Sequence, residues 1–240
     1  MRSLKRWGIL AVITIIGFTL TSCGGEEEDL ETGHLGNKLS LSGQVYDTEW
    51  DNNDNPIFIK INANISIDPE GNAGGNGSVK NGKLSFNIGT PAANNLTDIN
   101  DLLETLNAMG DYANVKSNIT SVKAYRLNNI FTDHSQLARG NINKKGNEQN
   151  GSSIYEDVTY VYVNKDVKIT AKGDKEVNED DDWKYTDNFK DICLSLKKGW
   201  NVIYQKNNRV WSTNNSGFYI STRTQTITVK NPSSMKWFLD

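Results

Sequence analysis

Hydrophobic and polar residues alternate along most of the chain after residue 39. The longest regular stretch runs from Ile57 to Ile67, where isoleucine or alanine occupies every second position and polar residues fall mostly between them. A period of two is typical of a β-strand with one buried face. We therefore predict one continuous strand over 57–67.

Shorter alternating stretches predict further strands in the second half of the chain. They cover Ile119–Leu127, Ile154–Val163, Val167–Ala171, Phe189–Leu196, Trp200–Gln205 and Phe218–Val229. Polar stretches at 139–153 and 174–182 lie between these strands, and we interpret them as connections. Upstream, Asn81-Gly82 predicts a tight hairpin, because this dipeptide readily adopts the positive φ of a type I′ turn.

One segment has helical rather than strand spacing. Apolar residues recur at intervals of three and four over 96–109, which predicts a helix. Asn95 or Thr97 is suited to cap its start, and Gly110 stands where a C-terminal cap would fall. We expect this helix to pack on the β core rather than to bind a partner.

Together these patterns predict a mainly β protein. Short, regularly spaced strands separated by turn clusters are typical of a sandwich or barrel. We expect an antiparallel β-sandwich, or barrel-like, body with one packed α-helix over residues 39–240. The alternative organisation is two small β units, at 39–140 and 152–240.

The first residues have a different pattern. Three basic residues at 2, 5 and 6 precede an apolar stretch over 7–20, which is the layout of a secretory signal. The stretch is shorter than the ~20 residues that a spanning helix needs. Leu20-Thr21-Ser22-Cys23 resembles a bacterial lipobox. That resemblance implies a signal peptide over 1–22, acylation of Cys23, and stable anchoring in the membrane by several acyl chains.

The residues after Cys23 predict a flexible tether over 23–38. Four consecutive acids at 26–29 lie among glycines and cannot form a packed element. The acids also resemble the export signal that follows the lipidated cysteine in surface lipoproteins of Bacteroidetes. This resemblance implies attachment to the bacterial outer membrane, at the cell surface or on the periplasmic face. The alternative is a simple flexible stalk.

Charge and cysteine content narrow the classes of partner. Loss of residues 1–22 removes three basic side chains and no acid, so the net charge of −3 becomes about −6. A mildly acidic body argues against binding of nucleic acid or of anionic lipid headgroups.

If Cys23 is acylated, no disulfide within the chain is available to Cys193. We therefore predict a buried, unreactive thiol at Cys193.

A short part of the body is similar to a known family. Leu41-Ser42-Gly43-Gln44-Val45-Tyr46, the stretch 57–67 and Asn81-Gly82-Lys83-Leu84-Ser85-Phe86 are similar to the carboxypeptidase-regulatory-like, or transthyretin-like, β-sandwich. The similarity covers residues 39–90 and implies a sandwich there. The predicted helix at 97–109 departs from the family pattern, and no catalytic residue comes with the resemblance.

Tryptophans are the strongest candidates for ligand binding. Trp50, Trp183 and Trp211 lie beside predicted turns near asparagine and aspartate. Sugar rings stack on flat aromatic faces while polar side chains bind the hydroxyls, so these residues predict a glycan site. The alternative is that they cap the ends of a β core.

Other candidate chemistry is weaker. Asp133-His134-Ser135 contains the residue types of a catalytic triad, but triad members meet in space rather than in sequence. The stretch from Asp51 begins like a calcium loop, yet it lacks the glycine and glutamate that an EF-hand needs. A looser calcium site near Asp51 or Asp180 stays open. We assign no metal site, cofactor or catalytic residue.

Three functional hypotheses follow. The first is a lipid-anchored protein with a non-enzymatic structural, adhesive or partner-binding role, in contact with the membrane only through its lipid. The second is a glycan-binding module that uses Trp50, Trp183 or Trp211. The third is a hydrolase, for which the sequence offers no histidine or carboxylate motif.

Overall fold

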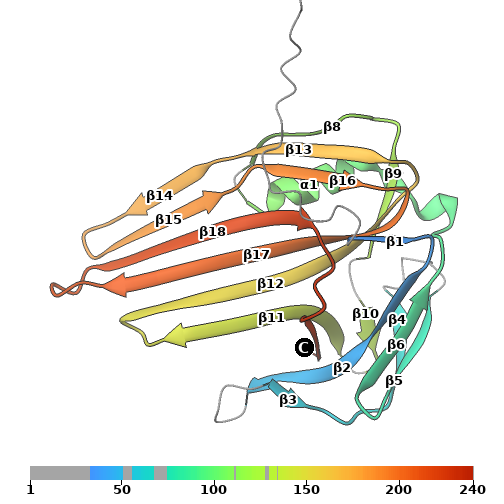
Figure 1. The fold of residues 1–240 in the computed structure, drawn as a ribbon, viewed down its shortest axis with the longest axis horizontal. Coiled ribbons are helices and arrows are strands. Elements are labelled where there is room, and N and C mark those ends of the chain that lie inside the picture. Colours follow the sequence, from blue (N-terminus) through green and yellow to red (C-terminus); the bar gives the residue numbers. More distant parts are fainter. Residues whose placement is uncertain are drawn as a thin grey trace, which may run out of the picture.

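A computed structural model describes residues 33–50, 56–67, 75–110, 112–127, 130–133 and 135–239 (Figure 1). The predicted signal peptide, Cys23 and nearly all of the tether lie outside these residues, as do Asp51, His134 and the side chain of Trp50. Within the described part, no helix is long and apolar enough to cross a membrane.

The described residues form strands and one α-helix, so the prediction of a mainly β fold with one helix is confirmed. The first half contains β1 (His34–Gly36), β2 (Leu39–Trp50), β3 (Pro56–Phe58), β4 (Ala63–Ile67), β5 (Asn76–Lys80), β6 (Lys83–Ile88), β7 (Thr97–Asp98), α1 (Ile99–Ala108), β8 (Tyr112–Ser117) and β9 (Lys123–Leu127). The second half contains β10 (Ile130–Thr132), β11 (Gln136–Gly146), β12 (Asn150–Val163), β13 (Val167–Gly173), β14 (Lys175–Glu179), β15 (Trp183–Phe189), β16 (Ile192–Leu196), β17 (Gly199–Thr213), β18 (Tyr219–Val229) and β19 (Lys236–Leu239).

Sixteen strands belong to one mixed sheet, whose main path runs β10-β4-β5-β6-β2-β19-β11-β12-β17-β18-β15-β14. Part of this sheet closes into a ring, because β11 pairs with β10 as well as with β19. Most neighbours are antiparallel; the pairs β15–β18 and β19–β2 are parallel. The other three strands, β16, β13 and β8, form a small second sheet.

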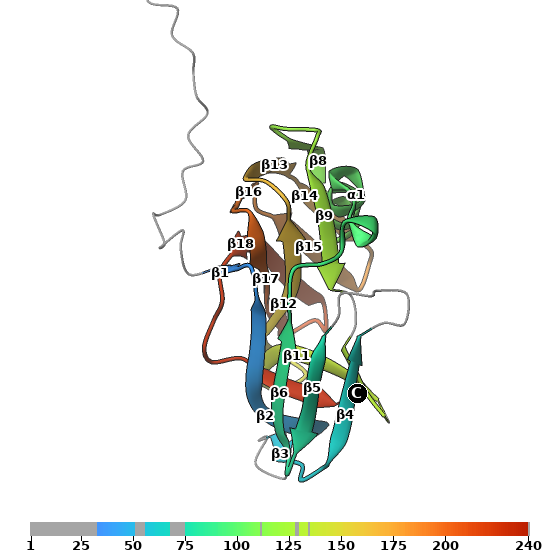
Figure 2. The same cartoon turned by 90° about the vertical axis from the view of Figure 1, so that its right-hand side faces the viewer.

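The body has two hydrophobic cores, one on each face of the long central strands (Figure 2). The ring encloses the first, where Trp200 and Phe86 are fully buried. The small sheet and α1 cover the opposite face and enclose the second, which contains Ile169, Leu106 and Ile203. Alternate residues of β12 and β17 therefore supply both cores, as expected for strands covered on both faces.

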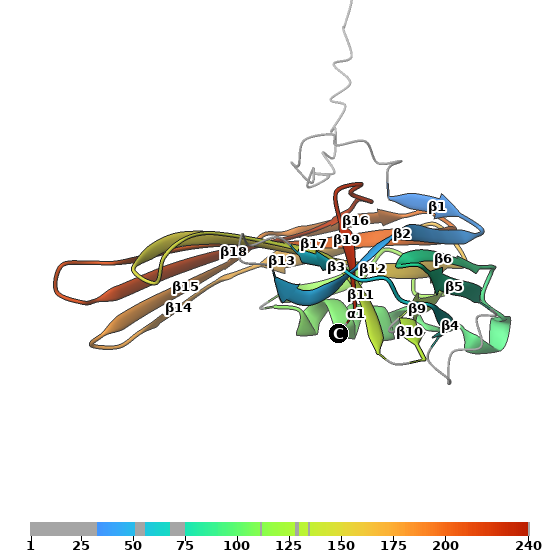
Figure 3. The ribbon, with the colours of Figure 1, turned by 90° about the horizontal axis from the view of Figure 1, so that it is seen from below.

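Beyond these covers, six strands continue as a sheet that projects from the body (Figures 1 and 3). We call this part the distal platform and define it as residues 141–156, 174–188 and 206–224. It consists of the outer halves of the hairpins β11–β12 and β17–β18 together with the hairpin β14–β15. Most of its side chains are exposed or half-buried, in contrast to those of the body.

Two local predictions about strands were wrong. The predicted strand at 57–67 is divided into β3 and β4, because the chain changes its hydrogen-bonding partner between them. Ile59 N–H donates to the Val45 carbonyl of β2, whereas the Ile61 carbonyl accepts from Gly82 N–H in the β5–β6 turn. The polar stretches 139–153 and 174–182, interpreted as connections, instead form most of β11, the start of β12, and β14. Trp200–Gln205 continues through a polar extension to Thr213.

The turn and the helix agree more closely with expectation. Asn81 and Gly82 have φ values of 49° and 72°, which confirms the predicted turn. The helix spans Ile99–Ala108, and Asp98 rather than Asn95 or Thr97 caps it by accepting a hydrogen bond from Asn100 N–H.

Candidate functional site

Strand register brings the candidate site together on one face of the distal platform. Side chains of paired residues point to the same side of a sheet. One row across the platform joins Trp211, Ser221, Tyr185 and Asn178, and a row two residues away joins Arg209, Arg223, Asp187 and Glu176. We call this side the aromatic face. The opposite side, the aliphatic face, carries exposed Val177, Val210 and Ile220.

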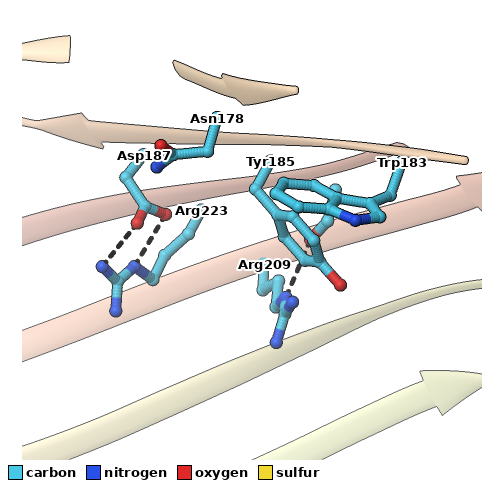
Figure 4. Close-up of a pocket in the computed structure, with 7 residues that line it drawn as sticks. Asn178, Trp183, Tyr185, Asp187, Arg209 and Arg223 are labelled. Atoms are coloured by element: carbon cyan, nitrogen blue, oxygen red, sulfur yellow. Dashed lines mark hydrogen bonds and ion pairs between the residues drawn. The ribbon is translucent and has the colours of Figure 1, made fainter. Parts of the chain in front are cut away.

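The aromatic face contains an open pocket of about 340 Å³ (Figure 4). Its lining comes from four neighbouring strands: Asn178 of β14, Trp183, Tyr185 and Asp187 of β15, Arg209 of β17, and Ser221 and Arg223 of β18. The volume is at the lower end of the range for small-molecule sites. These strands are continuous with the body or pair directly with strands that are, so the pocket has a regular backbone frame.

Aromatic rings form one side of the pocket. The rings of Trp183 and Tyr185 lie with centroids 4.8 Å apart and planes tilted by 57°. Tyr219 extends the cluster, its ring centroid 5.7 Å from that of Tyr185. All three side chains are half-buried, so part of each ring surface is open to solvent. Such rings offer a flat apolar surface with polar edges.

The two arginines of the pocket differ in their partners. Arg223 makes a two-point ion pair with Asp187, with Nε–Oδ1 at 3.0 Å and a terminal nitrogen 2.7 Å from Oδ2. Arg209 donates from Nε to the Ser221 hydroxyl at 2.8 Å, and its guanidinium lies 5.6 Å from the Tyr185 ring centroid. Among the described residues, no carboxylate lies within ion-pair distance of Arg209.

The structure separates the three predicted tryptophans. Trp183 lines the pocket, whereas Trp211 is on the same face but is 8% exposed and does not line it. The Trp211 ring packs on Gly151, where a Cβ would collide with it, and its Nε1 donates to the Asn147 carbonyl at 2.8 Å. Trp50 ends β2, which pairs with strands outside the platform; its side chain is outside the described residues.

The other predicted positions contribute no described site. Asp180 accepts a hydrogen bond from Asp181 N–H in the β14–β15 turn. Nowhere in the described ranges do three or more His, Cys, Asp or Glu side chains gather as a metal site would require. Asp51 and His134 lie outside those ranges.

Cys193 differs from the prediction of a buried thiol. Its side chain is half-buried, because it alternates in β16 with the core residues Ile192 and Leu194 and points away from them. Cys193 is also disulfide-bonded rather than a free thiol. The chain has two cysteines, so acylation of Cys23 and a disulfide between the two cysteines are alternative states of the chain.

One half-buried carboxylate marks the junction between platform and body. Asp157 of β12 pairs across the ladder with Gly140 and Gln205. Burial raises the pKa of Asp157 from its usual value near 3.8 to about 6. An acid in this position is easier to bury protonated than ionised.

Sequence patterns missed Tyr185, Arg209 and Arg223 as site residues. They lie in polar or Thr-rich stretches in which no apolar alternation marks a strand. Tyr185 and Arg209 each stand two residues from a tryptophan on the same strand, so their side chains point to the same face of the sheet as Trp183 and Trp211. That Arg223 lies on this face too is known only from the strand register. Comparison with protein-family models, curated proteins and solved structures finds no match to this chain.

Proposed function

We propose that this chain is an exported bacterial lipoprotein, anchored in the outer membrane through Cys23, whose body acts by binding a partner rather than by catalysis. The pattern of residues 1–23 supports the anchor, and the acids at 26–29 support a tether that holds the body away from the bilayer. The observation that carries the binding role is the open aromatic pocket on one face of the distal platform.

The pocket chemistry favours binding over hydrolysis. Glycoside hydrolysis normally uses two carboxyl groups that face each other across the substrate. The pocket lining contains one, Asp187, and Arg223 holds it in an ion pair. Of the two hydroxyls in the lining, that of Ser221 is bonded to Arg209 rather than to a general base, and the other is the phenol of Tyr185. These groups can orient a ligand, and none is arranged to activate a nucleophile.

Glycan binding is the second candidate, and one observation favours it. Trp183, Tyr185 and Tyr219 place three partly open rings side by side, next to polar Asn178. Stacked sugar rings need this combination of apolar faces and hydrogen-bonding groups. In this proposal sugar rings stack on Tyr185 and Tyr219 instead of on Trp211.

The anchor is tested in cells expressing the full chain. Metabolic labelling with an alkynyl fatty acid and mass spectrometry of the N-terminal peptide should find acylated Cys23 in the membrane fraction. Cys23→Ser should abolish the label and release the protein. Cys193→Ser is the matched control and should leave both unchanged. An unlabelled Cys23 recovered in a disulfide with Cys193 would overturn the anchor.

The binding role is tested with the soluble Cys23→Ser full chain on an array of saccharides and immobilised matrix proteins. We expect the double variant Trp183→Ala/Tyr219→Ala to lose at least tenfold in affinity for the ligand found. Val210→Thr, on the aliphatic face, is the matched control and should bind normally. Full binding by the double variant would refute the aromatic face as the binding surface.

A further inference from the structure

We propose that the platform pocket binds a carboxylate-bearing sugar unit, with the sugar ring against Trp183 and Tyr185 and its carboxylate at Arg209. This inference rests on the proposed binding function and specifies its ligand class. Three features of the pocket support this ligand: its charge, the donors that Arg209 retains, and the shape of the aromatic surface.

Charge gives the pocket its preference for an anion. Its lining contains two guanidinium groups and one carboxylate. Asp187 accepts two hydrogen bonds from Arg223, so the charges of these two side chains cancel. Arg209 contributes the remaining positive charge of the lining, while Glu176, on the same face but outside the lining, accepts a hydrogen bond from the Asn178 amide. A ligand with one carboxylate would neutralise the pocket.

Arg209 is also oriented to receive that carboxylate. A guanidinium carries five N–H donors in a fixed planar fork. Its Nε–H is bonded to Ser221, while the ring of Tyr185 lies against the guanidinium. These two contacts fix the side chain and leave the terminal N–H groups for a ligand (Figure 4). Two parallel hydrogen bonds to a carboxylate are the strongest use of such a group.

The aromatic surface favours a saccharide over another small acid. Trp183 and Tyr185 are half-buried and tilted by 57° to each other, so they form a bent apolar surface on which the C–H face of a pyranose can lie. Asn178 is exposed at the rim, and its Nδ2 donates to Glu176 Oε1, which leaves the amide oxygen for a hydroxyl. A volume of about 340 Å³ fits one or two sugar units.

The openness of the pocket indicates an internal unit of a longer chain. The sheet face continues beyond the lining residues toward Tyr219 and the three hairpin turns. A polysaccharide could therefore pass across the platform, while a free acid of the same type would use the pocket alone. Affinity should increase from monomer to trimer.

The test uses the soluble Cys23→Ser full chain and paired probes. The probes are a galacturonic-acid trimer and sialyllactose, each compared with its methyl ester, which keeps the ring and removes the charge. Isothermal titration should give at least tenfold tighter binding of one acid than of its ester. Arg209→Gln should reduce binding of the acid to the level of its ester and so remove that difference. Trp183→Ala should weaken both forms.

Lys206→Gln is the matched control, because Lys206 lies three residues from Arg209 on the same strand but on the aliphatic face. Equal binding of acid and ester, or acid binding unaffected by Arg209→Gln, would overturn the assignment of a carboxylate. Absence of saccharide binding, with a matrix protein bound through Trp183 and Tyr219, would overturn the sugar ligand and leave the binding function standing. A ligand insensitive to every aromatic-face variant would refute both.

Discussion

The body and the distal platform share the same strands but stabilise them differently. In β17, residues Gly199–Tyr204 are buried on both faces, whereas from Gln205 to Thr213 only Trp211 is buried. The backbone ladder to β12 nevertheless continues without interruption from Gly199 to Ser212. Isolated hairpins are at best marginally stable in water. The platform shows that a sheet can extend past its core when the body holds the register of its strands.

Because the body holds the strand register, the side chains on the two faces of the platform are not restricted to apolar residues that pack in a core. In the body, apolar contacts determine which side chain can stand at each position. On the platform the aromatic face combines rings and charges, and the aliphatic face exposes valine and isoleucine. A binding surface can therefore be built there at little cost to the body. The comparison predicts large, global effects of body substitutions and small, local effects on the platform.

The largest effect is expected from Trp200→Ala. Trp200 is fully buried, packs edge to face against Tyr125 and Tyr162, and donates from Nε1 to the Gly89 carbonyl. Its loss should reduce the free energy of unfolding by about 3–5 kcal/mol. Urea denaturation of the full chain measures this, and Trp200→Phe should recover most of the loss. A cost below about 1 kcal/mol would show that the ring core does not stabilise the fold.

Trp211→Ala tests the same residue type eleven positions along the same strand. Trp211 covers Gly151 and is buried on the platform rather than in the body. We expect a cost of about 1–3 kcal/mol that appears as local opening. Hydrogen exchange should accelerate in the β11–β12 and β17–β18 turns while exchange in the body is unchanged. Equal acceleration in both regions would show that body and platform unfold as one unit.

The same contrast explains what the sequence could predict. Apolar alternation identified body strands such as Val167–Ala171, because burial of one face selects every second residue. It missed β14, all of whose side chains are exposed, and most of β11. Without a buried face there is no selection for a period of two. The strand there is defined by pairing with its neighbour, which is a tertiary property.

The candidate site was predictable only in part for the same reason. Trp183 was identified from its residue type and its position beside an acidic turn. Its partners Arg209 and Arg223 come from strands 26 and 40 positions later, and register alone places them beside it. The strand predicted at 57–67 shows the opposite error. There the alternation is present, but the chain changes partners and divides the strand.

Asp157→Asn tests the junction between the two regions through its pH dependence. Because burial raises the pKa of Asp157 to about 6, the folded state keeps a proton between pH 4 and 6 that the unfolded state releases. Stability should therefore fall as pH rises through this interval, and the penalty is complete above pH 6. The variant should be more stable than wild type by about 1–3 kcal/mol at pH 8 and equal at pH 4. A constant difference would locate the effect in packing rather than in ionisation.

The smallest effect on stability is expected from Trp183→Ala, since this tryptophan is less buried than Trp200 and Trp211. Trp183 is half-buried, and its described ring contact is with Tyr185 on the same strand. The substitution should cost about 0.5–1 kcal/mol, which is typical of an aromatic pair, while ligand binding on the aromatic face is weakened. Urea denaturation and titration of the same preparation measure the two effects together. A cost approaching that of Trp200→Ala would mean that the rings stabilise the platform, and the aromatic face would then be a structural element rather than a surface kept open for a ligand.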